Sequence, residues 1–175
     1  MTLTAEVAGT EGAASTEGSR STEPASASVR SQQTLTYAGA REVVDAAATR
    51  ACALGVPVNI AVVDLAGALL AFARLDGAPL MSGSIAQDKA YTVAAFNGVP
   101  THAWFGLIEA EPALREGIVH RDRLVIFAGG VPVTVDGTFV GAVGVSGGTA
   151  EQDRQIAEAG AGAMCSTHPA DGLLP

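Results

Sequence analysis

The sequence has few basic residues, and this shortage excludes one class of protein at once. It contains ten Lys and Arg against 18 Asp and Glu, which gives a formal net charge of −8. A nucleic-acid-binding protein needs clustered positive charge to neutralise phosphates. The densest basic stretch here, 121–123, has Asp122 between its two arginines. We therefore expect no nucleic-acid partner.

Long apolar runs and cysteines are also scarce. No apolar run approaches the ~20 residues of a membrane-spanning helix, and the start of the chain lacks the basic and apolar blocks of a secretory signal. The sequence thus predicts a cytoplasmic protein with no membrane partner. Cys52 and Cys165, the only cysteines, have no CxxC or CxxCH context. This argues against structural zinc and covalent c-type haem, and it predicts two buried free thiols.

Composition divides the chain into three segments. Residues 1–33 are rich in Ser, Thr, Ala, Gly and Glu and contain no aromatic residue, which predicts a disordered tail. Residues 34–166 form one predicted domain, and 167–175 form a short C-terminal tail. A hydrophobic content of 48% with only 16% charged residues supports a sizeable core, and it indicates that part of the surface is buried between copies in an oligomer.

Apolar spacing and turn residues predict the order of helices and strands. Helices are expected over 40–54, 84–97, 101–108, 112–118 and 150–165, and strands over 58–64, 68–74, 123–128, 131–135 and 138–147. Ser84 with Gln87, and Thr149 with Gln152, have capping-box spacing at two helix starts. Hairpin turns, including Asp136-Gly137, favour an antiparallel sheet with helices packed on it. The fold class is therefore α+β, and a Rossmann sheet is not supported.

Lys89, the only lysine, is the first candidate functional residue. It shares a predicted helix face with Ile85 and Val93. A lysine on such a face either reaches water, pairs with an acid such as Asp76 or Asp88, or is held in a ligand pocket. In a pocket, burial would lower its pKa and make it a base or a Schiff-base amine.

The histidines are the second group of candidates. His102 follows Pro100-Thr101 at a predicted helix start, whereas His120 lies among charges and His168 near the C-terminus. No pair has HxxxH or HExxH spacing, so no histidine metal cluster is predicted. A single neutral His can still be an iron ligand or a general base, with an ordinary surface or core role as the alternative.

Glycines before the last predicted helix indicate a close approach of backbone or ligand. The SGGT turn at 146–149 has the form of an anion cradle, but Glu151 and Asp153 in the following first turn would repel a phosphate. A tight turn with acids at the positive helix end is the favoured interpretation. Ser146 lacks GxSxG spacing, and GxxxxGK[ST] and GxGxxG motifs are missing. The residues alone therefore indicate a ligand-binding α+β domain.

Four blocks in order along the chain resemble the GlcG/HbpS family, which includes the C-terminal domain of PduO-type proteins. They are AVVDLAGALLAFARLDGA (61–78), SIAQDKAYTVAAF (84–96), VPTHAW (99–104) and the glycine-rich block 129–161. The resemblance covers about 35–165. It implies a five-stranded antiparallel sheet flanked by helices, of profilin-like character. It also implies assembly into dimers or larger rings such as octamers, and a small-ligand pocket that holds haem in some members.

The same resemblance implies roles for single residues. The Pro-Thr pair that approaches iron in a haem-binding member matches Pro100-Thr101, while Lys89 and Arg74 match further family positions. His102 departs from the family and would be a stronger iron ligand than Thr101. The cofactor is then haem or a related tetrapyrrole, with Arg74 or Lys89 on a propionate. The expected pocket lies between the Lys89 helix and the turns at Gly129, Gly130 and Gly147.

Two other functions remain open at this point. The alternative to a haem protein is a metal-free isomerase or cyclase of secondary metabolism, with His102 or Lys89 as general base and backbone amides of the glycine turns stabilising an oxyanion. The chain would also suit a structural or regulatory oligomer without chemistry. A Soret band on addition of hemin distinguishes the haem protein from both.

Overall fold

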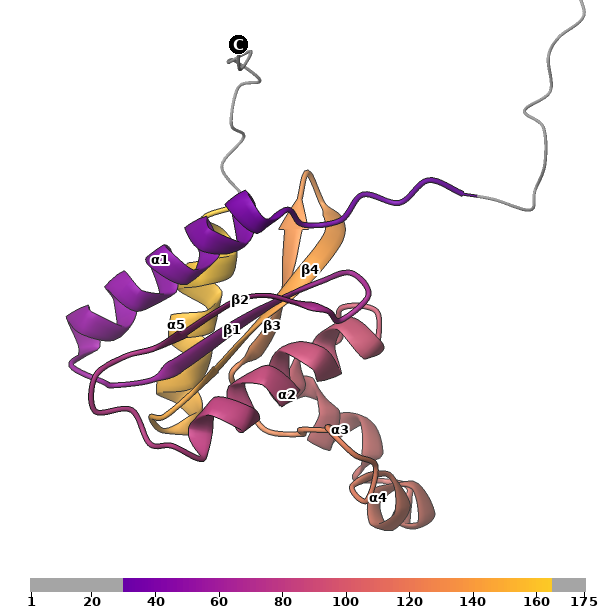
Figure 1. Cartoon of the computed structure of the whole chain (residues 1–175). Helices are drawn as coiled ribbons and strands as arrows, with labels where there is room; N and C mark the ends of the chain where they lie inside the picture. The colour runs from indigo at the N-terminus through magenta and orange to yellow at the C-terminus, as the bar shows by residue number, and fades with distance from the viewer. Residues whose placement is uncertain (1–29, 165–175) are drawn as a thin grey trace, which may run out of the picture. The chain divides into compact units, whose positions relative to one another are not determined.

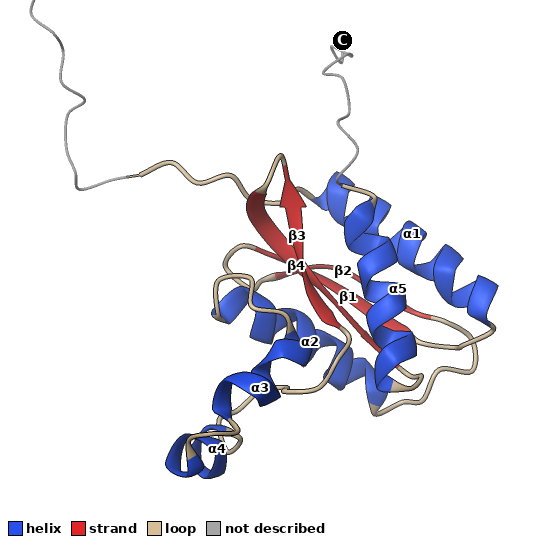
Figure 2. Ribbon diagram, turned by 180° about the vertical axis from the view of Figure 1, so that it is seen from behind, coloured by secondary structure: helices blue, strands red, loops and turns tan. Residues whose placement is uncertain are grey.

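A four-stranded antiparallel sheet lies between two layers of helices in the computed structural model, which describes residues 30–164. The strand order is β2-β1-β4-β3. The strands are β1 (Asn59–Asp64), β2 (Leu69–Arg74), β3 (Gly130–Val135) and β4 (Thr138–Ser146). Helices α1 (Tyr37–Leu54) and α5 (Ala150–Gly162) cover one face, and α2 (Ser82–Ala95) covers the other (Figures 1 and 2).

The two faces of the sheet carry separate cores, which differ in the size of their side chains. On the face towards α1 and α5, strand residues such as Ile60 and Val143 form the larger cluster. On the face towards α2 the residues are smaller, and Ala61, Ala90 and Ala142 are fully buried there. Because side chains alternate along a strand, the apolar runs of β1 and β4 supply both faces. The small residues let α2 lie close to the sheet.

Three further short helices follow α2, and the last two, α3 (Trp104–Ile108) and α4 (Pro112–Ile118), extend away from the sheet (Figure 1). The first of the three is the 3₁₀ helix η1 (Thr101–Ala103). The predictions over 101–108 and 112–118 are thereby confirmed. Helix α4 contains no buried residue, whereas Trp104 of α3 packs edge-on against Phe96, with ring centroids 4.4 Å apart.

Most local signals at helix ends are confirmed. Gly55, with φ of 67°, ends α1, and Thr149 with Gln152 forms the predicted capping box of α5. The capping box at Ser84 is wrong, because α2 already begins at Ser82 and the Ser84 hydroxyl donates to the Met81 carbonyl at 3.0 Å.

The strand predicted over 123–128 is wrong, and so is the five-stranded sheet. Arg123 adopts φ of 65°. The hydroxyl of Thr92 in α2 donates to the Arg123 carbonyl at 2.8 Å and accepts from the Val125 amide at 3.0 Å. The backbone groups that a strand would pair in a ladder are satisfied here by a side chain. Within the described residues the sheet has four strands, with β3 at its edge.

Other expectations concern the surface and the termini. Cys52 is exposed near the end of α1, so the prediction of a buried thiol is wrong for this residue. Cys165, His168, most of the predicted N-terminal tail and all of the predicted C-terminal tail lie outside the described residues. Between residues 30 and 164, no helix is both long and apolar enough to cross a membrane.

Candidate functional site

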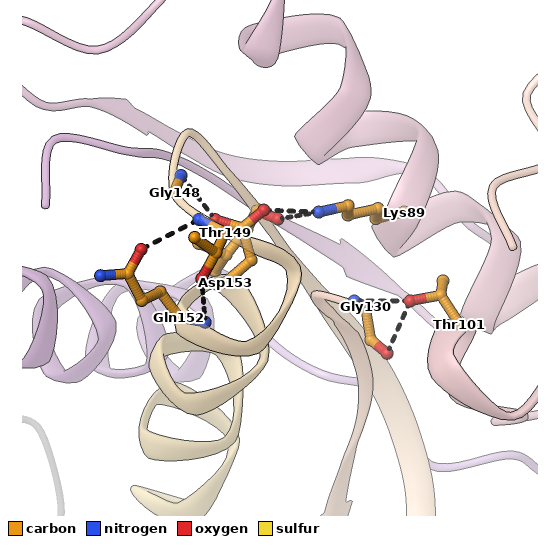
Figure 3. Close-up of polar contacts among 8 residues, drawn as sticks. Lys89, Thr101, Gly130, Gly148, Thr149, Gln152 and Asp153 are labelled. Carbon is orange, nitrogen blue, oxygen red and sulfur yellow. Dashed lines mark hydrogen bonds and ion pairs between the residues drawn. The ribbon is translucent and has the colours of Figure 1, made fainter. Parts of the chain in front are cut away.

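Lys89 and Asp153 form a buried ion pair at the end of β4 (Figure 3). Lys89 Nζ lies 2.8 Å from Asp153 Oδ2 and donates to the Val145 carbonyl at 2.7 Å. The Lys89 side chain is 0% exposed. Asp153 Oδ1 accepts from the Gly148 amide at 2.9 Å. Because Lys89 comes from α2 and Asp153 from α5, the pair joins the two helical layers.

Burial opposes charge on both members of this pair. It lowers the pKa of Lys89 and raises the pKa of Asp153, and their mutual hydrogen bond counteracts both effects. The ring of Phe127 covers the ammonium, with its centroid 4.9 Å from Nζ. The predicted partners Asp76 and Asp88 were wrong. Sequence reasoning missed Asp153, whose only signal was its place in a helix first turn, 64 residues away.

The predicted ligand-binding glycines surround this ion pair and are closely packed. A Cβ on Gly129 would lie 2.6 Å from Lys89 Nζ, and one on Gly130 would lie 2.6 Å from the methyl group of Thr101. A Cβ on Gly147 would lie 2.5 Å from the Pro57 carbonyl. The space that a side chain would need at each of these glycines is therefore already occupied by other protein atoms. Between residues 30 and 164, none of these three glycines lines any of four surface grooves with volumes of about 190 to 450 Å³.

Thr101 is fully buried and connects η1 to the start of β3 (Figure 3). Its hydroxyl accepts from the Gly130 amide at 2.9 Å and lies 3.4 Å from the Gly130 carbonyl, to which it donates. Both bonding directions of the hydroxyl are therefore used within the protein. Thr101 fixes the backbone that presents the next residue, His102.

His102 lines a groove of about 280 Å³ between η1, β3 and α5. Its Nδ1 atom is buried and has no hydrogen-bond partner among the described residues. Burial, followed by the charge of Arg154, lowers the pKa of His102 below its ordinary value of 6.5, so the imidazole is neutral at pH 7. The groove is otherwise formed by Pro100, Val131, Pro132, Thr134, Glu158, Ala161 and Gly162.

The other predicted site residues are not brought to this groove. Arg74 is at the end of β2, the opposite edge strand, where its Nε and Nη2 donate to the Ala78 carbonyl at 3.2 and 2.9 Å. Lys89 is enclosed in its ion pair and does not line the His102 groove. Arg154 and Glu158 were missed, although their i,i+4 spacing on the last helix could have placed them on one face.

Among the described residues, no metal-binding cluster accompanies the groove. Within residues 30–164, no three or more His, Cys, Asp or Glu side chains are grouped so that they could hold a metal ion. His102 is thus a single nitrogen donor in an apolar setting. The fold and this site define an α+β domain with an antiparallel sheet and one histidine in a groove at the sheet edge.

The chain belongs to the family described as haem degrading protein HbpS-like, whose model matches residues 35–162. It is 39% identical over 138 residues to the uncharacterized 15.0 kDa protein in the dhaT-dhaS intergenic region of Citrobacter freundii, covering 74% of this chain and 92% of that protein. It is 34% identical over 125 residues to the corrinoid adenosyltransferase PduO of Salmonella typhimurium, covering 71% of this chain. The match spans only 37% of PduO.

Solved structures agree with this assignment. Protein ORFY of Klebsiella pneumoniae superposes with a TM-score of 0.72 at 31% identity, covering 81% of this chain and 97% of that one. The PduOC:heme complex superposes with a TM-score of 0.67 at 32% identity, covering 75% of this chain and 96% of that one. The sequence resemblance to the GlcG/HbpS family is confirmed.

Proposed function

We propose that the protein binds haem, or a related tetrapyrrole, through His102 in the groove between η1, β3 and α5. The observation that carries the proposal is a neutral imidazole that borders an apolar groove and makes no hydrogen bond to the described residues. Family membership and the haem complex of PduOC support the same ligand class.

The residues present fit this cofactor. An imidazole nitrogen is a common protein ligand of haem iron, and Pro100, Val131 and Pro132 offer apolar contact to a macrocycle. Arg154, whose side chain is partly exposed beside Glu158, would pair with a propionate. Haem, when bound, would supply iron redox chemistry. Thr101 acts as a positioning residue in this proposal, because its hydroxyl is committed to Gly130.

Self-association is part of the same proposal. The groove, at about 280 Å³, is just below the ~300–1,000 Å³ range of ligand pockets, so one copy would cover a macrocycle only partly. Near η1, helices α3 and α4 expose Phe105, Leu107 and Leu114. Apolar side chains of this kind support contact with further copies of the chain.

Hemin titration of His102→Ala tests the ligand assignment. Wild-type protein should give a saturable Soret shift, and His102→Ala should bind at least about tenfold more weakly because the imidazole–iron bond is lost. His120→Ala is the matched control, since His120 is exposed after α4 and does not line the groove. Equal titrations of the two variants, or a wild-type signal that never saturates, would refute the proposal.

The pH dependence of hemin binding follows from the neutral imidazole. Protonation of His102 competes with iron, so affinity falls as the pH drops through the pKa of this residue. Because burial lowers that pKa below 6.5, more than half of the high-pH affinity should remain at pH 6.5, and most of the loss should come in more acidic solution. Hemin titrations between about pH 8 and 5, the range in which histidine ordinarily titrates, measure this change in affinity. Loss of half the affinity above pH 6.5 would contradict the assignment.

A further inference from the structure

We propose a second ligand site, at the β1–β2 turn, for a small carboxylate that carries a hydroxyl or amino group on the adjacent carbon. A groove of about 450 Å³ lies there, separate in its lining from the His102 groove. Residues 67–69 form one wall of this groove. Ser84, Gln87 and Asp88 of α2 form another wall, and Arg123 also lines the groove. The proposal does not depend on haem binding.

Arg123 is held in place by three separate contacts. Its Nε donates to Asp88 Oδ1 at 2.9 Å, and its Cζ lies 3.7 Å from the ring centroid of Tyr91. Its carbonyl accepts from the buried hydroxyl of Thr92, which stabilises the left-handed backbone conformation of φ 65°. This conformation is uncommon for a residue other than glycine. The guanidinium is therefore oriented before any ligand arrives.

Fold stability does not account for the Arg123–Asp88 ion pair. The side chains of Arg123 and Asp88 are 43% and 32% exposed, and ion pairs of this kind contribute little to stability. Unusual backbone conformations cluster at ligand-binding sites, where the surrounding structure maintains them. An oriented arginine at the rim of a polar groove fits a binding role.

The unused bonding groups define the ligand class. Arginine has five N–H donors, and among the described residues Asp88 takes only the one on Nε. The two Nη groups match a carboxylate in the paired geometry that arginine favours. Asp88 Oδ2 accepts no hydrogen bond from the described residues, so it can accept from a hydroxyl or ammonium group. Asp88 and the net charge of −8 would repel a phosphate dianion more strongly than a singly charged carboxylate.

Calorimetric titration of the full chain with lactate, propionate and inorganic phosphate tests the site. Wild-type protein should bind lactate saturably and more tightly than propionate, which lacks the hydroxyl, and phosphate most weakly. Arg123→Gln should weaken lactate binding at least about tenfold, as expected for loss of a charged hydrogen-bond pair. Arg115→Gln is the matched control, because it removes the same charge from an exposed ion pair with Glu116.

Asp88→Ala provides a second readout that separates binding from folding. Without this carboxylate, propionate should bind at least as well as in wild-type protein, and the preference for lactate should disappear. Several results would overturn the proposal. These are no saturable lactate binding by wild-type protein, equal lactate affinity of Arg123→Gln and Arg115→Gln, tighter binding of phosphate than of lactate, or a lactate preference that survives in Asp88→Ala.

Discussion

Asp153→Ala is expected to lower the free energy of unfolding by about 3–5 kcal/mol, because it leaves the Lys89 ammonium buried without a counter-charge. Lys89 is 0% exposed, and its remaining bond to the Val145 carbonyl does not neutralise it. The Gly148 amide also loses its acceptor. Domains of this size have a total stability of about 5–15 kcal/mol, so the loss should be evident in urea unfolding followed by circular dichroism.

Two further variants separate the ion pair from other effects. Glu151→Ala removes an exposed acid from the same first turn of α5 and should cause only a small fraction of the loss. The double variant Lys89→Met/Asp153→Leu should recover most of the stability, since apolar replacement of a buried pair is often neutral. An Asp153→Ala protein as stable as wild type would show that Lys89 does not need this partner.

Gly144→Ala is expected to destabilise the fold by about 3 kcal/mol, at the upper end of ordinary overpacking costs. Gly144 lies in β4 between β1 and β3, beneath α2. An added Cβ would collide with the Ala86 carbonyl and lie 2.5 Å from the Ala90 amide. Both are backbone groups of α2 and cannot rotate away, so the helix would have to move off the sheet. Thermal unfolding measures the effect.

Gly117→Ala is the matched control for this steric argument. Gly117 lies in α4, and a Cβ there would meet nothing within 4 Å. Alanine is a better helix former than glycine, so this variant should be as stable as wild type or slightly more stable. If Gly144→Ala unfolded at the same temperature as Gly117→Ala, close packing of α2 on β4 would not be a requirement of the fold.

Much of the architecture could be predicted because its signals are local. Gly55 ends α1 since it adopts a left-handed conformation, and Thr149 with Gln152 starts α5 through bonds within one turn. The 123–128 segment shows the limit of such signals. Its apolar, β-branched residues suit a strand, but Thr92 of α2 bonds the backbone on both sides of Leu124. A distant side chain decided the conformation of a segment whose own composition favoured a strand.

The candidate site likewise has features that the sequence determined and features that only the tertiary structure decided. The sequence by itself determined the helix–strand order outside 123–128, the antiparallel pairing of its hairpins, the family resemblance and the interest of Lys89 and His102. Only the tertiary structure decided that Lys89 pairs with Asp153, that Thr101 is engaged by Gly130, and that Arg74 is at the opposite sheet edge from His102. The physical reason is distance along the chain. Capping, turns and apolar periodicity act within a few residues, whereas an ion pair or groove depends on which elements the packed core brings together.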